Sequence, residues 1–245
     1  MKLSVISPTF NEAENVPRLV EQLARVLHAI DYEILIVDDD SPDRTWSVAR
    51  DISLTNPRVR VLRRMQNPSL SAAVIEGFCV AEGDVLACID ADLQHDPSVL
   101  PAMLEELQKG AEVVVASRYC EGGGTERWHW FRRLVSWTAT KMAQTFLGFK
   151  LTDPMSGYFL IRCEDFRRIQ TGLNGKGFKI LLEILSKIQP SRIGEVSYTF
   201  RARTAGKSKL TSRVIIHYFG QLWRLSRTAR SEPRPLVQPS RLLSR

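Results

Sequence analysis

The chain has 245 residues, with 34 Lys or Arg against 27 Asp or Glu and a formal net charge of +7. Its 44% hydrophobic and 25% charged residues are typical of a globular protein and exclude a disordered or fibrous one. The length suits one α/β domain or two small domains. Residues 1–117 have 10 basic and 19 acidic side chains, a net of −9, whereas residues 118–245 have 24 basic and 8 acidic, a net of +16. This asymmetry indicates a partner that carries charge of its own.

The first half alternates short β-branched runs with segments of helical periodicity. Strands are predicted at residues 3–7, 33–37, 59–62, 85–89 and 113–116. Helices are predicted at residues 16–30, 43–54, 72–81 and 96–109, the last with Pro97 in its first turn and ended by Gly110. Strict alternation of this kind predicts a mostly parallel sheet that is covered by helices on both faces.

The pattern changes after Arg118. Gly122, Gly123 and Gly124 predict a loop, and residues 128–149 a long helix rich in Trp, Phe and Arg. Further strands are predicted at 158–161 and 196–200, and a helix at 179–188. We expect one globular domain over residues 1–208, an amphipathic helix at 209–226 and a basic, disordered tail at 227–245.

Neither a membrane span nor a cysteine scaffold is indicated. The N-terminal apolar segment meets Pro8 after a few residues and is too short for a signal peptide. Residues 214–223, among the longest uncharged runs, fall short of the ~18–20 apolar residues that a bilayer span requires. The cysteines form no C-x-x-C pair, which argues against a zinc site and favours reduced thiols (Cys79, Cys88, Cys120 and Cys163).

Polar clusters follow three of the predicted strands. They are Ser-Pro-Thr-Phe-Asn-Glu at 7–12, Asp-Asp-Asp-Ser-Pro-Asp at 38–43 and Asp-Ala-Asp-Leu-Gln-His at 90–95. Because ligands of parallel α/β sheets bind beyond the carboxyl ends of the strands, these clusters are expected to form one site. Asp90 and Asp92 are hard oxygen ligands that suit Mg²⁺ or Mn²⁺. Taken alone, Asp-x-Asp equally fits an acidic turn that caps the following helix, but three converging clusters favour the metal.

Other classes of protein fit less well. No G-x-G-x-x-G follows the first strand and no P-loop motif is present, which excludes those two nucleotide-binding motifs. Residues 34–39 are similar to the opening strand of a response-regulator receiver, a distant alternative because a strand and a helix precede them here. The positive net charge also leaves a nucleic-acid-binding protein as an alternative, one whose binding would be salt-sensitive.

At this point the motifs carry a family resemblance. Residues 5–15, 37–45 and 90–97 resemble the inverting GT-A glycosyltransferases, and among these most of all the polyprenyl-phosphate (dolichol-phosphate type) mannosyltransferases. Further similar segments are 117–119, 153–157, 177–183 and 200–210, so the resemblance covers residues 3 to about 212. It implies a GT-A fold and identifies residues 1–208 as a catalytic domain. The loop at 67–71 departs from the pattern, because relatives often have glycine there.

The resemblance also implies roles for individual residues. The donor nucleotide is expected to be bound by Pro8, Phe10, Glu12, Val37, Asp39, Asp90, Ala91 and Asp92. The metal ion, Mg²⁺ or Mn²⁺, is expected on Asp90, Asp92 and Gln94. The donor diphosphate and the acceptor phosphate are expected on Arg118, Arg132, Lys179 and Arg203, with Arg133 as an alternative to Arg132. Asp92, Arg118 and Arg203 are the implied catalytic residues.

The implied reaction is the inverting transfer of one hexose, foremost mannose, from a nucleotide sugar to a polyprenyl phosphate. GDP-mannose is the favoured donor, with UDP-glucose or a saccharide hydroxyl acceptor as alternatives. A lipid phosphate is already ionised at pH 7, so catalysis is mainly positioning and stabilisation of the leaving diphosphate. A hydroxyl acceptor would need a base, for which Glu183 is a candidate, although that residue equally fits a helix face or an ion pair.

We therefore expect the protein to bind a membrane surface, although no transmembrane segment is predicted. Residues 128–149 and 210–225 are candidate interfacial helices, and for both the alternative is packing against the sheet. We expect peripheral attachment at the cytoplasmic face of a membrane, with an anchoring partner subunit as a further possibility and no nucleic-acid partner.

Overall fold

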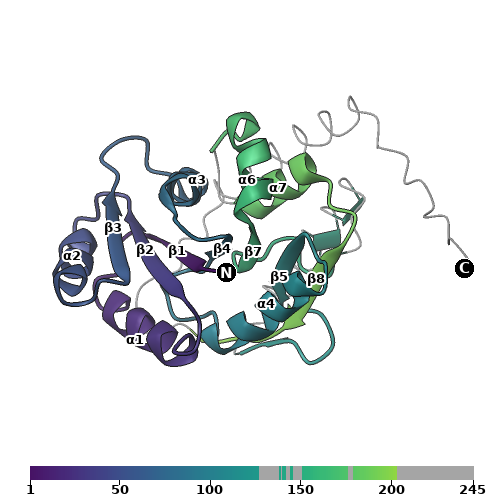
Figure 1. Cartoon of the computed structure of the whole chain (residues 1–245), viewed down its shortest axis with the longest axis horizontal. Helices are drawn as coiled ribbons and strands as arrows, with labels where there is room; N and C mark the ends of the chain where they lie inside the picture. The colour runs from purple at the N-terminus through teal and green to yellow at the C-terminus, as the bar shows by residue number, and fades with distance from the viewer. Residues whose placement is uncertain (127–137, 139, 142–143, 146–150, 176–178, 203–245) are drawn as a thin grey trace, which may run out of the picture.

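The computed structural model describes residues 1–126, 138, 140–141, 144–145, 151–175 and 179–202 (Figure 1). The strands are β1 (Leu3–Thr9), β2 (Tyr32–Asp38), β3 (Val59–Arg63), β4 (Val85–Cys88), β5 (Val113–Ser117), β6 (Gly124–Thr125), β7 (Phe159–Arg162), β8 (Ile193–Ser197) and β9 (Thr199–Phe200). The helices are α1 (Val16–Val26), α2 (Thr45–Thr55), α3 (Leu70–Val80), α4 (Leu100–Gln108), α6 (Cys163–Ile169) and α7 (Ile180–Ile188). Two 3-10 turns, η1 (Pro97–Val99) and η2 (Gln170–Gly172), complete the described elements.

Seven strands form one sheet in the order β3-β2-β1-β4-β7-β5-β8. β1 pairs in parallel with β2 and β4, β2 with β3, and β5 with β8. Only β7 runs antiparallel to its neighbours in this sheet, and its Phe159 lies opposite Cys88 of β4 and Val115 of β5. The prediction of a mostly parallel sheet is therefore confirmed, and the short strands β6 and β9 form a second, parallel pair.

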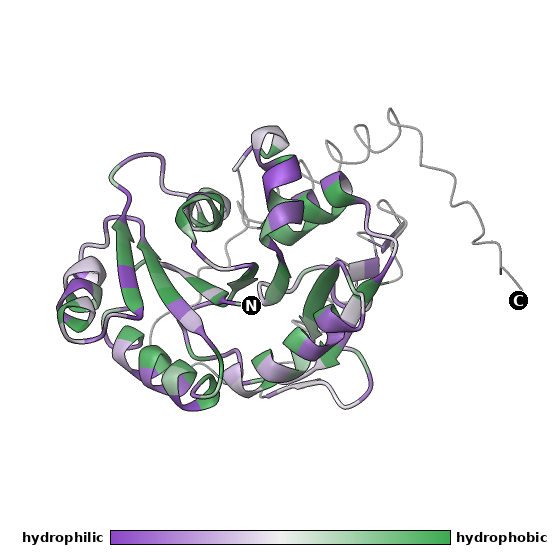
Figure 2. Ribbon diagram, viewed as in Figure 1, coloured by the Kyte–Doolittle hydropathy of each residue, from purple (hydrophilic) through white to green (hydrophobic). Residues whose placement is uncertain are grey.

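Helices cover both faces of the large sheet, as predicted. In Figure 1, α1, α2 and α4 lie on one face and α3, α6 and α7 on the other. One buried cluster joins α1 and α4 to the sheet, including Leu23 and Met103, and the other is built around Phe78, Phe159 and Phe166. Phe78 meets Phe166 edge to face at 5.2 Å between ring centroids. Figure 2 shows the strands of the large sheet mainly in the hydrophobic colour, which agrees with burial on both faces.

Several predicted boundaries shift, for local reasons. The predicted helix at 96–109 begins instead with the 3-10 turn η1, whose first residue follows the capping Asp96; its carboxylate accepts a hydrogen bond of 3.0 Å from the Ser98 N–H. α4 then ends at Gln108, one residue before the predicted end, and is followed by Gly110, which has a φ of +99°. α1 ends at Val26 rather than at residue 30.

Two predictions for the second half need correction. The single strand predicted at 196–200 is wrong, because Tyr198 separates β8, which pairs with β5, from β9, which pairs with β6. Helix α6 was not predicted, since seven residues with two buried apolar side chains, Cys163 and Phe166, are too few to display a helical period. Of the helix predicted at 128–149, residues 138, 140, 141, 144 and 145 are described and are helical. The segments predicted at 209–226 and 227–245 lie outside the described residues.

Candidate active site

The loops that follow β1 and β2 are bound to each other at the carboxyl edge of the sheet. The Thr9 hydroxyl donates to the Asp38 carboxylate at 2.9 Å, and the Asn11 N–H donates to the Ser41 hydroxyl at 2.9 Å. The Glu12 N–H donates to the Thr45 hydroxyl at the start of α2, also at 2.9 Å. The first two predicted clusters therefore form one surface. β4 lies on the other side of β1, which brings the third cluster to the same edge.

The loops after β1, β2, β3 and β4 each contain at least one non-glycine residue in the left-handed region. These residues are Asn11, Asp40, Arg44, Asn67 and Leu93, with φ of 58°, 51°, 61°, 51° and 60°. Asn and Asp tolerate this conformation, whereas in Arg44 and Leu93 it costs roughly 1–2 kcal/mol each. Such strain concentrates at functional sites. The loop at 67–71 lacks the glycine that relatives often have, but Asn67 adopts the left-handed conformation that a glycine would supply.

The first two residues of the acidic triplet at the end of β2, Asp38 and Asp39, have different hydrogen-bond partners. Asp38 is fully buried and accepts from Thr9 and from both the N–H and the hydroxyl of Ser41, so it holds the loops together. Asp39, predicted to bind the donor nucleotide, accepts from the Arg64 guanidinium and, at 2.8 Å, from the Ser69 N–H. Burial raises the pKa of Asp39 despite the opposing charge of Arg64. Arg64 was not predicted as a site residue, although its place directly after β3 was a usable signal.

The remaining residues predicted to bind the nucleoside differ in how exposed their side chains are. Phe10 is 39% exposed, whereas Val37 is fully buried, with its side chain, like that of Ile6, packed against Gly77 of α3. Val37 can therefore contact a ligand only through its backbone. Glu12 accepts from the Asn15 amide at 2.6 Å, and Pro8 is half-buried at the end of β1.

The predicted metal ligands lie in the loop after β4. The Asp90 side chain is 33% exposed, and Asp92 is buried with its carboxylate accepting the Gln94 N–H at 3.1 Å. The Gln94 amide donates to the Arg201 carbonyl at 2.9 Å, and Ala91 is buried between the two carboxylates in sequence. Across the described residues, no group of three His, Cys, Asp or Glu side chains is placed to hold a metal ion. Two carboxylates and an amide fit a cation such as Mg²⁺ or Mn²⁺ that completes its shell with water and substrate phosphate oxygens.

Arg118 is held by a carboxylate to which the sequence analysis gave no role. Its Nε and Nη2 donate to the two oxygens of Asp153 at 2.6 and 2.8 Å, and its backbone N–H donates to the same carboxylate at 3.2 Å. Asp153 is fully buried. Burial opposes the charge on Arg118, but the bonds to Asp153 outweigh it and raise the pKa of the guanidinium. Arg118 therefore stays charged and fixed in direction.

Lys179 lies beside this pair. Its ammonium donates to the Met155 carbonyl at 2.9 Å. Burial and then the charge of Arg118 lower the pKa of Lys179 to about 8, with Asp90 and Asp153 acting in the opposite sense. The structure thus brings two of the predicted phosphate-binding cations together next to the acidic loop. The other two, Arg132 and Arg203, lie outside the described residues, as does the alternative Arg133.

Glu183, the candidate base for a hydroxyl acceptor, accepts two hydrogen bonds from Asn174. It is 2% exposed and accepts from both the backbone N–H of Asn174, at 2.6 Å, and its side-chain amide, at 3.1 Å. These bonds fasten the segment before α7 to that helix. The arrangement favours the structural alternative for Glu183 over a catalytic one.

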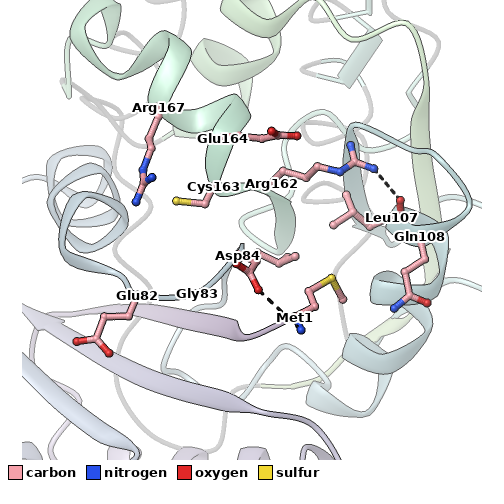
Figure 3. Close-up of a pocket in the computed structure, with 11 residues that line it drawn as sticks. Met1, Glu82, Gly83, Asp84, Leu107, Gln108, Arg162, Cys163, Glu164 and Arg167 are labelled. Atoms are coloured by element: carbon pink, nitrogen blue, oxygen red, sulfur yellow. Dashed lines mark hydrogen bonds and ion pairs between the residues drawn. The ribbon is translucent and has the colours of Figure 1, made fainter.

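A cavity of about 410 Å³ opens at the opposite edge of the sheet, where β1 and β4 begin. Figure 3 shows Arg162 beside it, bonded to the Leu107 carbonyl at 2.9 Å, with Asp84 and Cys163 nearby. None of the predicted site residues lines this cavity. The converging loops, not this cavity, therefore form the candidate active site.

A mostly parallel sheet with an Asp-x-Asp loop at its carboxyl edge and a fixed Arg–Lys pair beside it defines a nucleotide-sugar transferase of GT-A type. Residues 4–170 match the family described as Glycosyl transferase family 2, and the chain belongs to this family of glycosyltransferases. The seven-stranded arrangement and this membership overturn the response-regulator alternative. Within the described residues, no helix has the length and apolar character that crossing a bilayer requires.

Named relatives extend over most of the chain. A dolichol-phosphate mannosyltransferase of Pyrococcus furiosus is 44% identical over 227 residues, covering 92% of this chain and 64% of the relative, so the chain spans just under two thirds of that protein. The dolichol-phosphate mannosyltransferase of Saccharomyces cerevisiae is 37% identical, covering 91% and 86%. The undecaprenyl-phosphate mannosyltransferase of Micrococcus luteus is 34% identical, covering 88% and 90%.

Solved structures share the fold at lower identity. Mannosyl-3-phosphoglycerate synthase from Rubrobacter xylanophilus superimposes with a TM-score of 0.66 at 20% identity, covering 98% of this chain and 79% of the other. Glucosyl-3-phosphoglycerate synthase from Mycobacterium tuberculosis, in complex with Mn²⁺, UDP and glucosyl-3-phosphoglycerate, gives 0.67 at 19% identity, covering 95% and 81%. These likenesses confirm the predicted GT-A fold.

Proposed function

We propose that this glycosyltransferase moves a single mannose from a nucleotide diphosphate sugar to a polyprenyl phosphate, with inversion at the anomeric carbon. The observation that carries the proposal is the fixed Arg118–Asp153 pair with Lys179 beside the Asp90 loop. Two cations there suit two phosphate groups, one of the donor and one of the acceptor. The names of the relatives from P. furiosus, S. cerevisiae and M. luteus support mannose and a polyprenyl phosphate.

In the proposed reaction, an acceptor phosphate oxygen forms a bond to the anomeric carbon as the bond from that carbon to the donor diphosphate breaks. The attacking oxygen already carries charge, so no side chain has to remove a proton, in agreement with the structural role of Glu183. Arg118 and Lys179, together with the predicted Arg132 and Arg203, orient the phosphates. The electron pair of the broken bond leaves with the nucleoside diphosphate.

We infer that Asp90, Asp92 and Gln94 hold a divalent cation, Mg²⁺ or Mn²⁺, on the donor diphosphate. When bound, this ion supplies Lewis-acid stabilisation of the leaving group. The M. tuberculosis synthase with Mn²⁺ and UDP supports a divalent ion in this fold. For the nucleoside we propose Phe10 as a stacking surface and Asp39 as a polar contact, with GDP-mannose the favoured donor and UDP-glucose the alternative.

The proposed setting is the cytoplasmic face of a membrane, with peripheral attachment. Residues 118–245 carry a net charge of +16, and each cation near an anionic surface adds about 1 kcal/mol of attraction. Residues 128–149 and 210–225 remain the proposed interfacial segments. An anchoring partner subunit would serve the same purpose, and reconstitution of the purified chain with vesicles tests whether it is required.

The reaction is tested by incubating the purified chain with labelled donor, Mn²⁺ or Mg²⁺ and a short polyprenyl phosphate, followed by organic extraction. The proposal expects label in the organic phase from GDP-mannose, and less from UDP-glucose. An Asp92→Ala variant serves as the control without the metal-binding carboxylate. Label that appears only in an added saccharide would favour the hydroxyl-acceptor alternative. No lipid product from any donor would refute the proposal.

A further inference from the structure

His95 lies in a buried aromatic box directly behind the Asp90 loop. It is 3% exposed. Its ring stacks on Tyr158, with 5.2 Å between centroids and 12° between planes. Tyr198 and Phe200 meet its edges at 5.7 and 5.4 Å. Three aromatic rings thus fix the plane of the imidazole.

Packing alone does not account for an imidazole in this box. Within the described residues, the buried Nδ1 has no hydrogen-bond partner, and leaving such an atom unpaired destabilises the folded state. Phenylalanine would fill the same space without that cost. The other nitrogen, Nε2, faces Asp90 and lies 3.7 Å from its Oδ2. The imidazole therefore presents its polar edge to a carboxylate of the predicted metal loop.

Gly157 also lies close to the same carboxylate. A Cβ atom at position 157 would lie 3.1 Å from Asp90 Oδ2 and 3.5 Å from Oδ1. A side chain at this position would require the carboxylate to shift by a few tenths of an ångström. Asp90 thus lies close to both the imidazole of His95 and the backbone of Gly157, while a third of its side chain is open to solvent.

We propose that His95 is a positioning residue that orients the Asp90 carboxylate for the cation of the donor diphosphate. The inference rests on the proposed function for the metal role of Asp90. It adds a partner behind that ligand, comparable to the groups that orient metal-binding side chains in other proteins, whose loss typically weakens metal affinity by about 10–100-fold. The aromatic box fixes the imidazole, and the imidazole in turn fixes the carboxylate.

The test measures Mn²⁺ binding in the presence of GDP by the EPR signal of free Mn²⁺, with no lipid acceptor present. His95→Phe keeps the aromatic packing and removes both nitrogens; we expect an unchanged or higher thermal midpoint and about 10–100-fold weaker Mn²⁺ binding. His95→Gln keeps an N–H donor without the ring and should recover part of the affinity. Tyr158→Phe is the matched control, because it keeps the stacked ring and loses only the 3.2 Å bond from its hydroxyl to the Asp96 carbonyl. It should leave Mn²⁺ affinity within about twofold of the parent value.

A His95→Phe variant that binds Mn²⁺ like the parent would overturn the proposal. If that variant does not fold, His95→Leu decides, since it also removes both nitrogens from the buried box; unchanged Mn²⁺ affinity would then overturn the proposal, and weakened affinity would support it. If the parent chain binds Mn²⁺ with GDP but transfers nothing to lipid, the proposed function fails and the inference on His95 stands. If the parent chain binds no Mn²⁺ with any nucleoside diphosphate, both fail.

Discussion

Replacing Asp153 by Asn should damage both the stability and the activity of the protein. The change keeps the shape of the side chain but leaves the Arg118 guanidinium without the carboxylate that accepts its bonds of 2.6 and 2.8 Å. Asp153 is fully buried and the Arg118 side chain is only 10% exposed, so water cannot replace the lost partner. Removing one member of a buried pair costs about 3–5 kcal/mol. For a chain of this size that loss lowers the thermal midpoint by about 6–20 °C.

The effect on turnover follows from the position of Arg118. A shift of about 1 Å in a positioning group can reduce the rate about 10²-fold, so Asp153→Asn should lose roughly that much lipid-linked product. Thermal unfolding followed by circular dichroism measures the first effect and organic extraction of labelled product the second. Glu21→Gln is the matched control, because it breaks an ion pair with Arg25 in which both side chains are about 70% exposed, and it should change neither quantity.

The combined change of Arg118→Met and Asp153→Leu separates the two effects. Replacing a buried ion pair by apolar side chains of similar size is often neutral or stabilising. The double variant should therefore recover much of the stability that Asp153→Asn loses, but no activity. If Asp153→Asn unfolds within 1 kcal/mol of the parent and turns over at the parent rate, the reasoning about this pair is refuted.

Three further changes test other parts of the site. Asp92→Asn should abolish metal-dependent transfer and weaken Mn²⁺ binding with little effect on unfolding, whereas normal turnover would remove Asp92 from the metal site. Lys179, with its pKa lowered to about 8, is charged below that pH and loses its charge above it. The KM for polyprenyl phosphate should therefore rise up to about tenfold between pH 7 and 9. Lys179→Arg should remove that rise, because Arg keeps its charge throughout. A flat profile in the parent chain would contradict the role of Lys179. Phe10→Ala should raise the KM for the donor by about 5- to 150-fold, the equivalent of ~1–3 kcal/mol of base stacking, without loss of stability, and an unchanged KM would mean that the base does not stack there.

The parallel core was predictable because its strands are continuous apolar runs. All five residues of β5 are buried and six of the seven in β1, so a run of such residues admits few other interpretations. The rule that parallel strands end at one edge then places the polar clusters together, and the structure ties the first two by direct hydrogen bonds. The direction of β7 was not predictable, since an apolar run such as Phe159–Arg162 reads alike in a parallel or an antiparallel strand.

Ion pairs and ring contacts between residues that are far apart in the sequence were not predicted. Arg118 and Asp153 are 35 positions apart and Asp39 and Arg64 are 25 apart, and no local pattern couples either pair. His95 belongs to the polar cluster recognised at 90–95, yet its role depends on its contacts with Tyr158, Tyr198 and Phe200. The sequence thus predicts which residues approach the substrate, whereas the residues that hold them emerge only when β7, β8 and β9 are placed beside the predicted metal loop.

The acidic half and the basic half of the chain each contribute residues of their own charge to the candidate site. The −9 half supplies the acidic loops after β2 and β4, and the +16 half supplies Arg118 and Lys179. The two halves also meet directly, because Arg201 is paired with Asp96 at 2.6 Å. A cation on the acidic loop and fixed cations beside it would together surround two phosphate groups. Under the proposed function, this arrangement explains how a chain with an acidic half binds an anionic donor and an anionic acceptor.

The central claim is that the charge of the acceptor phosphate replaces a catalytic base. It is tested most directly by offering the chain GDP-mannose and Mn²⁺ with either polyprenyl phosphate or the polyprenol of the same length, and by determining the anomeric configuration of the product. The account predicts mannosyl phosphate lipid with inverted configuration from the phosphate and no product from the alcohol. Comparable transfer to the polyprenol, or retention of configuration, would contradict it.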